Sequence, residues 1–185
     1  PGIIFKPERQ VGNDILKIEK LAAYQEGTTL FNDISFDIGR TDKVLIVSRN
    51  QTAITSFFNI INGEATPTSG KFEWGTTITK AYLPNNNQEY FESNHNLMEW
   101  LRQFVPAHIT DADEDFLRGF YGKMLFAGDE LNKKTKVLSG GEKVRCMISR
   151  MMLQNPNVII LDEPTNHLDL ESITAFNNGV IDFPG

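Results

Sequence analysis

The order of hydrophobic and polar residues predicts the strands of this chain. Ile15–Leu21 and Phe31–Ile38 alternate between apolar and polar residues, as strands with one buried face do. Lys43–Val47 carries a continuous apolar run, and we expect a strand that helices cover on both faces. Lys71–Trp74 and Thr77–Tyr82 form a hairpin-like pair of short segments.

Apolar residues at helical spacing predict five helices. In the first of them the expected buried face is Ile54, Phe57, Phe58 and Ile61. A further strand, Val158–Leu161, is apolar throughout and separates the last two helices. Strands that alternate with helices indicate an α/β layered fold with a mainly parallel central sheet. The predicted helices are Ala53–Ile61, Asn96–Phe104, Glu114–Phe126, Ser139–Leu153 and Asp169–Asn178.

The composition narrows the class of protein. A chain of 185 residues is expected to form one domain, here after a linker tail at 1–13. With 24 acidic and 18 basic residues the net charge is −6, which argues against nucleic-acid binding through a broadly basic face but leaves local patches open. The single Cys146 fits a reducing compartment, and no apolar run is long enough to span a bilayer. We therefore expect a cytoplasmic protein without a signal peptide.

The start of the helix Ser139–Leu153 has the residues of an anion site. Ser139 and Glu142 stand at the spacing of a capping box, in which each side chain bonds the backbone N–H of the other. Gly140 and Gly141 leave the first N–H groups uncovered at the positive end of the helix dipole, which suits a phosphate. The alternative interpretation is an ordinary helix cap.

Two adjacent carboxylates follow the strand Val158–Leu161. Asp162 and Glu163 lie where it ends, and open α/β sheets bind ligands at that edge. One carboxylate can coordinate Mg²⁺ while its neighbour polarises an attacking water. Taken alone, the pair is equally compatible with a solvated strand end.

Together, the two motifs resemble a known family. Leu138–Glu142 followed by Val158–Asp169 resembles the signature motif, Walker B motif and D-loop of an ATP-binding-cassette (ABC) nucleotide-binding domain. The D-loop form Asn166-His167-Leu168-Asp169 is similar to the ABC-F branch, whose soluble members carry two such domains and act at the ribosome. Transporter domains more often have Ser-Ala-Leu-Asp there.

The resemblance covers nearly the whole chain. It implies a nucleotide-binding domain over 14–185, with a small antiparallel β subdomain and a helical subdomain at about 95–155 that carries the signature motif. The segment from Pro7 onward resembles the entry from the interdomain linker into the second domain of such proteins.

The family's phosphate loop aligns with Ser48–Thr55 but is eroded. Both glycines of G-x-x-x-x-G-K-[ST] are lost, and Ile54 stands at the lysine position, so a positive charge for the β- and γ-phosphates is missing. Thr55 keeps the hydroxyl that would ligate Mg²⁺, and we expect the backbone N–H groups at the helix start to remain available. The loop is expected to bind ATP weakly and not to support efficient hydrolysis.

Two other departures from the family pattern agree with this. Tyr82–Asn85 resembles the Q-loop, with Asn85 where glutamine is usual. The chain stops at Ile181–Gly185, where the strand leading to the family's switch histidine should begin. None of its three histidines (His95, His108 and His167) stands at a position to substitute, and we interpret the missing strand as a truncation.

The resemblance implies two ATP sites shared head to tail with a second cassette. Ser139, Gly140 and Gly141 would clamp the γ-phosphate of ATP held by that partner domain, and Glu163 would be the general base at this chain's own site. Thr55 and Asp162 would hold Mg²⁺. The ATP contacts that the resemblance implies are Asn50, Ala53, Thr55, Ser56, Asn85, Ser139, Gly140, Gly141, Glu142, Asp162 and Asp169.

Three functions follow from the resemblance. The first is the second domain of an ABC-F-type ATPase that acts in translation, with the ribosome as partner and no membrane. The others are a non-catalytic module that ATP holds closed and the nucleotide-binding domain of a transporter. For the first of these we expect ATP hydrolysis in the full two-domain protein and an isolated domain that is inactive as an ATPase.

Overall fold

A computed structural model describes all 185 residues, which form two compact units. The first unit consists of residues 1–8 and 81–184, and the second of residues 9–80 with Gly185. None of the helices has the length and apolar character needed to cross a membrane.

The second unit is built on a three-stranded antiparallel sheet. Its strands β1 (Asp14–Gln25), β2 (Thr28–Gly39) and β3 (Ser69–Trp74) are arranged in the order β2-β1-β3. Between β1 and β2, Glu26 and Gly27 both have positive φ, of 49° and 78°, which suits the right-handed twist of a tight hairpin. This sheet confirms the predicted antiparallel β subdomain.

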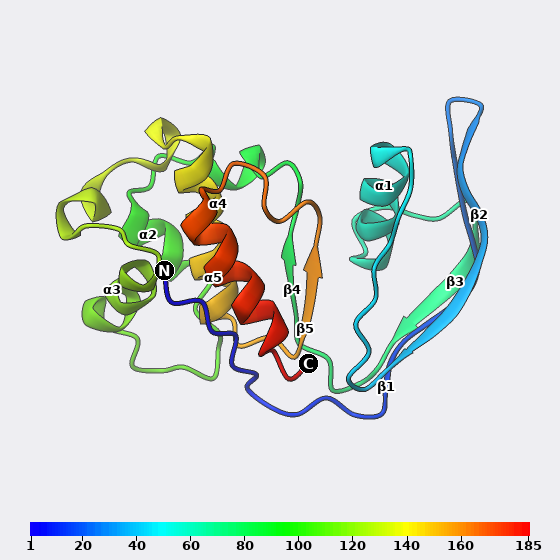
Figure 1. The fold of residues 1–185 in the computed structure, drawn as a ribbon, viewed down its shortest axis with the longest axis horizontal. Helices are drawn as coiled ribbons and strands as arrows, with labels where there is room; N and C mark the ends of the chain where they lie inside the picture. Colours follow the sequence, from blue (N-terminus) through cyan, green and yellow to red (C-terminus); the bar gives the residue numbers. More distant parts are fainter. The chain divides into compact units, whose positions relative to one another are not determined.

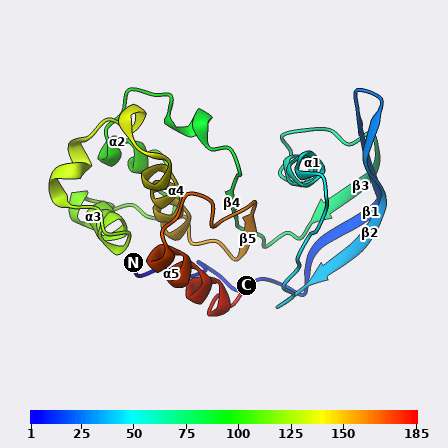
Figure 2. The same ribbon diagram turned by 45° about the horizontal axis from the view of Figure 1, so that its top comes forward.

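Helix α1 (Gln51–Ile61) lies on one face of this sheet, as Figures 1 and 2 both show. Phe57 holds it there, because its ring packs edge-on against Phe31 at 5.7 Å and stacks with Phe36 at 6.3 Å, both on β2. The buried face differs from the predicted one: Ala53 and Ile60 are buried with Phe57 and Ile61, while Ile54 and Phe58 are only half-buried.

The strand predicted at Lys43–Val47 is absent. The segment belongs to neither sheet and leaves Val44, Leu45 and Val47 exposed by 50%, 86% and 81%. An apolar run becomes a buried strand only where neighbouring strands take up its backbone hydrogen bonds and helices cover its faces. Lys43–Val47 forms no strand of either sheet, so the prediction of a covered strand was wrong for this structure.

The first unit contains the two remaining strands, β4 (Lys80–Leu83) and β5 (Val158–Leu161), which pair with each other. Their arrows point the same way in Figure 1. The mainly parallel central sheet is therefore represented by two strands. The hairpin expected from Lys71 to Tyr82 was wrong, because β3 pairs with β1 and β4 pairs with β5.

Four α-helices complete this unit and lie to one side of the two strands in Figure 1. They confirm the predicted helices, with bounds that differ by a few residues at several ends. Short 3₁₀ helices occupy Gln88–Phe91, Gly128–Asn132 and Thr135–Val137. The four helices are α2 (Leu97–Arg102), α3 (Glu114–Lys123), α4 (Gly140–Leu153) and α5 (Leu170–Ile181).

Helix α4 runs through the core of the first unit. It buries the residues that its spacing predicts, from Val144 to Met152, and it packs with α2 and α3, which contribute Trp100 and Tyr121. Each large side chain of this kind contributes about 1.5–3 kcal/mol when it leaves water. Burial also raises the pKa of the Cys146 thiol on α4, so this cysteine is protonated at neutral pH.

The N-terminal residues form no helix or strand but pack on the first unit. Ile3 and Phe5 are buried, and the Phe5 ring meets those of Phe176 and Phe183 edge-on at 6.3 and 6.2 Å. Glu8 donates its N–H to the carbonyl of Asn155 at 3.0 Å. Residues 1–8 therefore behave as part of the folded unit.

Candidate functional site

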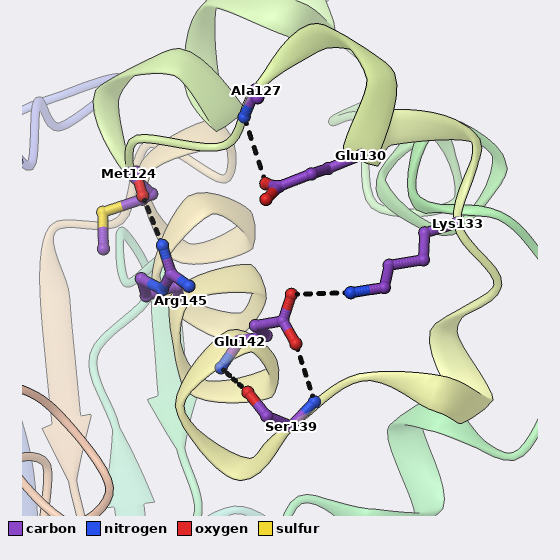
Figure 3. Close-up of polar contacts among 7 residues, drawn as sticks. All are labelled: Met124, Ala127, Glu130, Lys133, Ser139, Glu142 and Arg145. Atoms are coloured by element: carbon purple, nitrogen blue, oxygen red, sulfur yellow. Dashed lines mark hydrogen bonds and ion pairs between the residues drawn. The ribbon is translucent and has the colours of Figure 1, made fainter.

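The start of α4 is closed by the predicted capping box. Ser139 Oγ accepts the N–H of Glu142 at 3.2 Å, and Glu142 Oε1 accepts the N–H of Ser139 at 2.9 Å, as Figure 3 shows. Lys133 Nζ lies 3.2 Å from the other carboxylate oxygen. Both oxygens of Glu142 are thus engaged within the chain.

These contacts change the titration of Glu142. The Ser139 N–H is the main group that holds the pKa of this carboxyl below its usual value, and burial opposes it. Lys133 adds to the lowering as a hydrogen-bond donor and as a positive charge. The capping carboxylate is therefore ionised throughout the neutral range.

The glycine pair has a role that the sequence did not reveal. A Cβ at Gly141 would lie 2.8 Å from the carbonyl oxygen of His167, and a Cβ at Gly140 would lie 3.4 Å from the His167 ring. The turn after β5 therefore packs against the start of α4. The backbone of His167 can come this close because Gly141 has no side chain. Ser139 and Gly140 remain exposed, so this tip of the signature helix is open on its other side.

The two carboxylates after β5 lie in different surroundings. Asp162 is 2% exposed, and its N–H extends the strand pairing by bonding the carbonyl of Leu83 at 3.0 Å. Glu163 is exposed, has φ 51°, and accepts the side-chain N–H of Asn166 at 3.0 Å. One carboxylate is therefore buried and the other exposed, and their division between a metal partner and a base stays a prediction.

The residues present offer a metal ion at most a carboxylate or two, so a magnesium ion here would need phosphate oxygens of a ligand as well. No group of three His, Cys, Asp or Glu side chains stands close enough to cage a metal. Mg²⁺ usually keeps several waters and takes one or two carboxylates plus phosphate oxygens. Asp162 could supply such a carboxylate.

A polar hollow of about 350 Å³ lies between the end of β4, the start of α4 and the turn after β5. It brings together three predicted residues, Asn85, Gly140 and Glu163. Its lining also includes Asn166 and His167 of the predicted D-loop, and sequence reasoning missed its other polar residues, which are Asn86, Asn87 and Lys143. Only the position of Lys143, one residue after the signature motif, could have signalled its place.

Asp169 has a local structural role. Its Oδ1 accepts the N–H of Ser172 at 2.7 Å and so caps α5, and this backbone hydrogen bond lowers the pKa of its carboxyl.

The phosphate-loop residues lie in the second unit, where the loop caps its own helix. Asn50 Oδ1 accepts the N–H of Thr52, and Ser48 Oγ accepts the N–H of Asn50, each at 3.0 Å. The prediction that the N–H groups at this helix start stay available was wrong for these two. Ala53 is buried, and Thr55 and Ser56 are half-buried on α1.

These motifs and this fold agree with a family comparison. The family model described as ABC transporter matches residues 31–166, more than half of the chain. The chain belongs to this family. ABC ATP-binding domains bind ATP, typically with Mg²⁺.

Three relatives within the ABC family illustrate its range. The uncharacterized ABC transporter ATP-binding protein YkpA of Bacillus subtilis is 54% identical over 100% of this chain and 34% of its own length. The probable ATP-binding protein YbiT of Escherichia coli O157:H7 is 31% identical over 96% of this chain and 33% of its own. The energy-dependent translational throttle protein EttA of Haemophilus influenzae is 27% identical over 99% and 33%. The chain thus spans about a third of the length of these relatives.

Solved structures of the ABC family confirm the predicted fold. An ATP-binding subunit of an ABC transporter gives a TM-score of 0.73 at 21% identity, over 92% of this chain and 75% of its own. At this identity the likeness concerns the fold alone.

Proposed function

We propose that the chain is the second nucleotide-binding domain of a two-cassette ABC-F-type ATPase that acts in translation. In this role it supplies the signature tip at Ser139 to ATP that the partner cassette binds through its own phosphate loop. The observation that carries the proposal is the contrast between the two helix starts: Ser139 and Gly140 are exposed at the start of α4 with Gly141 beside them, whereas the loop before α1 has no glycine and Ile54 stands at the lysine position.

The start of α4 has the physical properties that this role needs. The first N–H groups of a helix have no partner inside it, and they attract anions together with the helix dipole. The capping box fixes the turn at Ser139. A γ-phosphate presented by a docking cassette would meet a pre-formed donor group.

The phosphate loop of this chain is poorly suited to hold ATP by itself. The N–H groups of Asn50 and Thr52 are bonded to side chains of the loop, so a phosphate would have to displace them. Ile54 offers no charge, and a hydrogen bond to a charged group typically contributes about 1.5–3 kcal/mol. We therefore assign the main catalytic contribution of this domain to its signature tip.

The choice of branch rests on the D-loop and on the relatives. Asn166-His167-Leu168-Asp169 resembles the ABC-F form, and a relative with 27% identity is named as a translational throttle protein. Relatives about three times as long as this chain leave room for a second cassette. A partner cassette and a ribosome are the partners that this assignment implies.

The deciding experiment is Ser139→Arg in the complete protein. A bulky cation at the exposed tip removes the cap and fills the place of the γ-phosphate, so we expect loss of most ATP turnover, about 100-fold or more. Ser139→Thr keeps a capping hydroxyl and is the matched control. Wild-type turnover in a folded Ser139→Arg protein would overturn the proposal.

The self-capped phosphate loop favours a second candidate for this chain's own site, in which ATP holds the interface closed without being cleaved there. Glu163→Gln in the complete protein separates the two. Unchanged turnover means that this site is silent, and a drop of tenfold or more, roughly the contribution of a general base, means that it hydrolyses ATP. Co-purification with a membrane-spanning partner would instead favour a transporter.

A further inference from the structure

A half-buried cation on α4 has no acidic partner. Arg150 lies in the last turn of the helix and forms no salt bridge. Its guanidinium carbon lies 4.8 Å from the centroid of the Tyr90 ring and 4.6 Å from that of Phe104. Nη1 reaches the carbonyl oxygen of Tyr82 at 3.5 Å.

Placing Arg150 here is energetically unfavourable, and the need to fill space in the core does not account for the choice of an arginine. Burial lowers the pKa of the Arg150 guanidinium, and its Nε is buried without a hydrogen-bond partner. A partly buried charge without a counter-charge is unfavourable, and two aromatic faces offset only part of that cost. The neighbouring core positions of α4 are filled by methionines, so an apolar residue would have been the simpler filling.

Two of the three contacts of Arg150, those to Tyr82 and Tyr90, lie on either side of the Asn85–Asn87 loop, which lines the polar hollow. Tyr82 lies just before Asn85–Asn87, and Tyr90 lies just after it. A second contact fixes Tyr90, because Trp100 Nε1 donates to its carbonyl at 2.6 Å. The Asn85–Asn87 loop connects β4 to the 3₁₀ helix at Gln88–Phe91. The guanidinium of Arg150 therefore contacts the chain at both ends of this loop.

We propose that Arg150 is a positioning residue that clamps the Asn85–Asn87 loop onto α4 and so fixes Asn85 relative to the signature tip at Ser139. Arg150 lines no part of the polar hollow and acts through the loop. The kinetic consequence rests on the proposed function, while the clamp itself can be tested without it.

The same helix offers a matched control. Arg145 has its guanidinium carbon 4.8 Å from the Phe126 ring, and its Nη1 donates to the carbonyl of Met124 at 3.2 Å, as Figure 3 shows. The chemistry is that of Arg150: an arginine of α4 on an aromatic ring and a backbone carbonyl. Its contacts lie just beyond the end of α3, away from the Asn85–Asn87 loop.

The experiment compares Arg150→Lys with Arg145→Lys in the complete protein. Lysine keeps the charge but loses the planar stacking and the fork of donors. We expect amide hydrogen exchange of residues 82–91 to become about tenfold faster in Arg150→Lys and unchanged in Arg145→Lys. We also expect kcat for ATP to fall about tenfold only in Arg150→Lys, with KM nearly unchanged, because a small misplacement affects the reacting geometry most.

A double substitution distinguishes positioning from general weakening. If Arg150 acts through Asn85, Arg150→Lys lowers kcat no further in an Asn85→Ala background, whereas independent effects multiply. Multiplying effects, equal losses in Arg145→Lys, or faster exchange with unchanged kcat would each overturn the proposal.

Two further outcomes remain distinct. If the wild-type protein has no ATPase activity, the proposed function fails, and the exchange measurement still decides whether the clamp exists. Should Arg150→Lys not fold, Arg150→Met fills the same space without charge, and unchanged exchange of 82–91 in that variant would overturn the clamp.

Discussion

At the scale of single residues, the backbone of His167 determines which neighbours the signature motif can carry. His167 has φ 65°, a left-handed conformation that is uncommon for residues other than glycine, and its carbonyl points at Gly141. The two signature glycines are therefore not equivalent. Gly141 is required for space, and Gly140 faces only the edge of an imidazole.

This difference predicts a loss of stability for one alanine substitution and little change for the other. Gly141→Ala would place a methyl group 2.8 Å from the His167 carbonyl and should lower the free energy of unfolding by about 1–3 kcal/mol. In Gly140→Ala the ring can shift slightly, and the higher helix propensity of alanine, about 0.5–1 kcal/mol, offsets the contact. Urea unfolding of the two variants measures both values. Equal destabilisation would contradict this assignment.

Glu142 predicts a pH dependence of stability. Its pKa in the folded protein is lowered from 4.5, so its charged form adds stability above that pH, and this contribution is lost as the pH falls through the lowered pKa. Glu142→Gln should be less stable than the wild type at pH 7 by less than about 1 kcal/mol. The difference in the free energy of unfolding between the two proteins should disappear at acid pH, and unfolding curves measured between pH 3 and 7 would show this. A difference that stays constant with pH would mean that the charge of Glu142 does not contribute to stability.

At the scale of elements, α1 and α4 show how the same kind of helix start can be used in two ways. Both begin with a side-chain cap, Asn50 and Ser139. Only α4 adds a glutamate that returns to the cap and two glycines that leave space beside it. The start of α1 is closed by loop side chains, with Ser48 as a second acceptor.

Removal of the Asn50 cap of α1 should lower the stability of the second unit. Asn50→Ala removes the acceptor of the Thr52 N–H and should destabilise the second unit by about 1 kcal/mol. Asn50→Asp keeps the acceptor and adds a charge that favours the helix N-terminus, so it should be at least as stable as the wild type. Thermal unfolding followed by circular dichroism compares the two. A loss of stability in Asn50→Asp would argue against the cap.

Elements with local patterns could be predicted from the sequence, and those that depend on distant partners could not. The capping box could be predicted from the spacing of Ser139 and Glu142, because its two partners lie only three residues apart in the sequence. Lys43–Val47 has the apolar composition of a buried strand, but composition does not supply the neighbouring strand that pairing requires. In the site, Lys143 was missed, and His167 was noted only as part of the D-loop, because only tertiary packing brings them beside Asn85 and Glu163.

At the scale of the whole molecule, the division into two units places one tryptophan in each. Trp100 is fully buried in the first unit, and Trp74 in the second donates Nε1 to the carbonyl of Ile61 at 2.7 Å. The larger apolar core belongs to the first unit. We expect the two units of the 185-residue chain to unfold in separate steps, with the second unit unfolding first.

Single-tryptophan variants test this expectation. Trp74→Phe leaves Trp100 as the reporter of the first unit, and Trp100→Phe leaves Trp74 as the reporter of the second. Fluorescence in urea should give a lower midpoint for Trp74 than for Trp100, since different probes coincide only in a two-state transition. Coincident midpoints, matched by a single circular dichroism transition in the wild type, would contradict independent unfolding.

The uncovered run Val44–Val47 has a practical consequence for work with these residues alone. Valine, leucine and isoleucine in a row, with no proline and no charge inside the run, favour pairing between identical chains that meet edge to edge. Preparations of this polypeptide should therefore self-associate as their concentration rises. A single lysine at Leu45, the most exposed of the four, should delay that process.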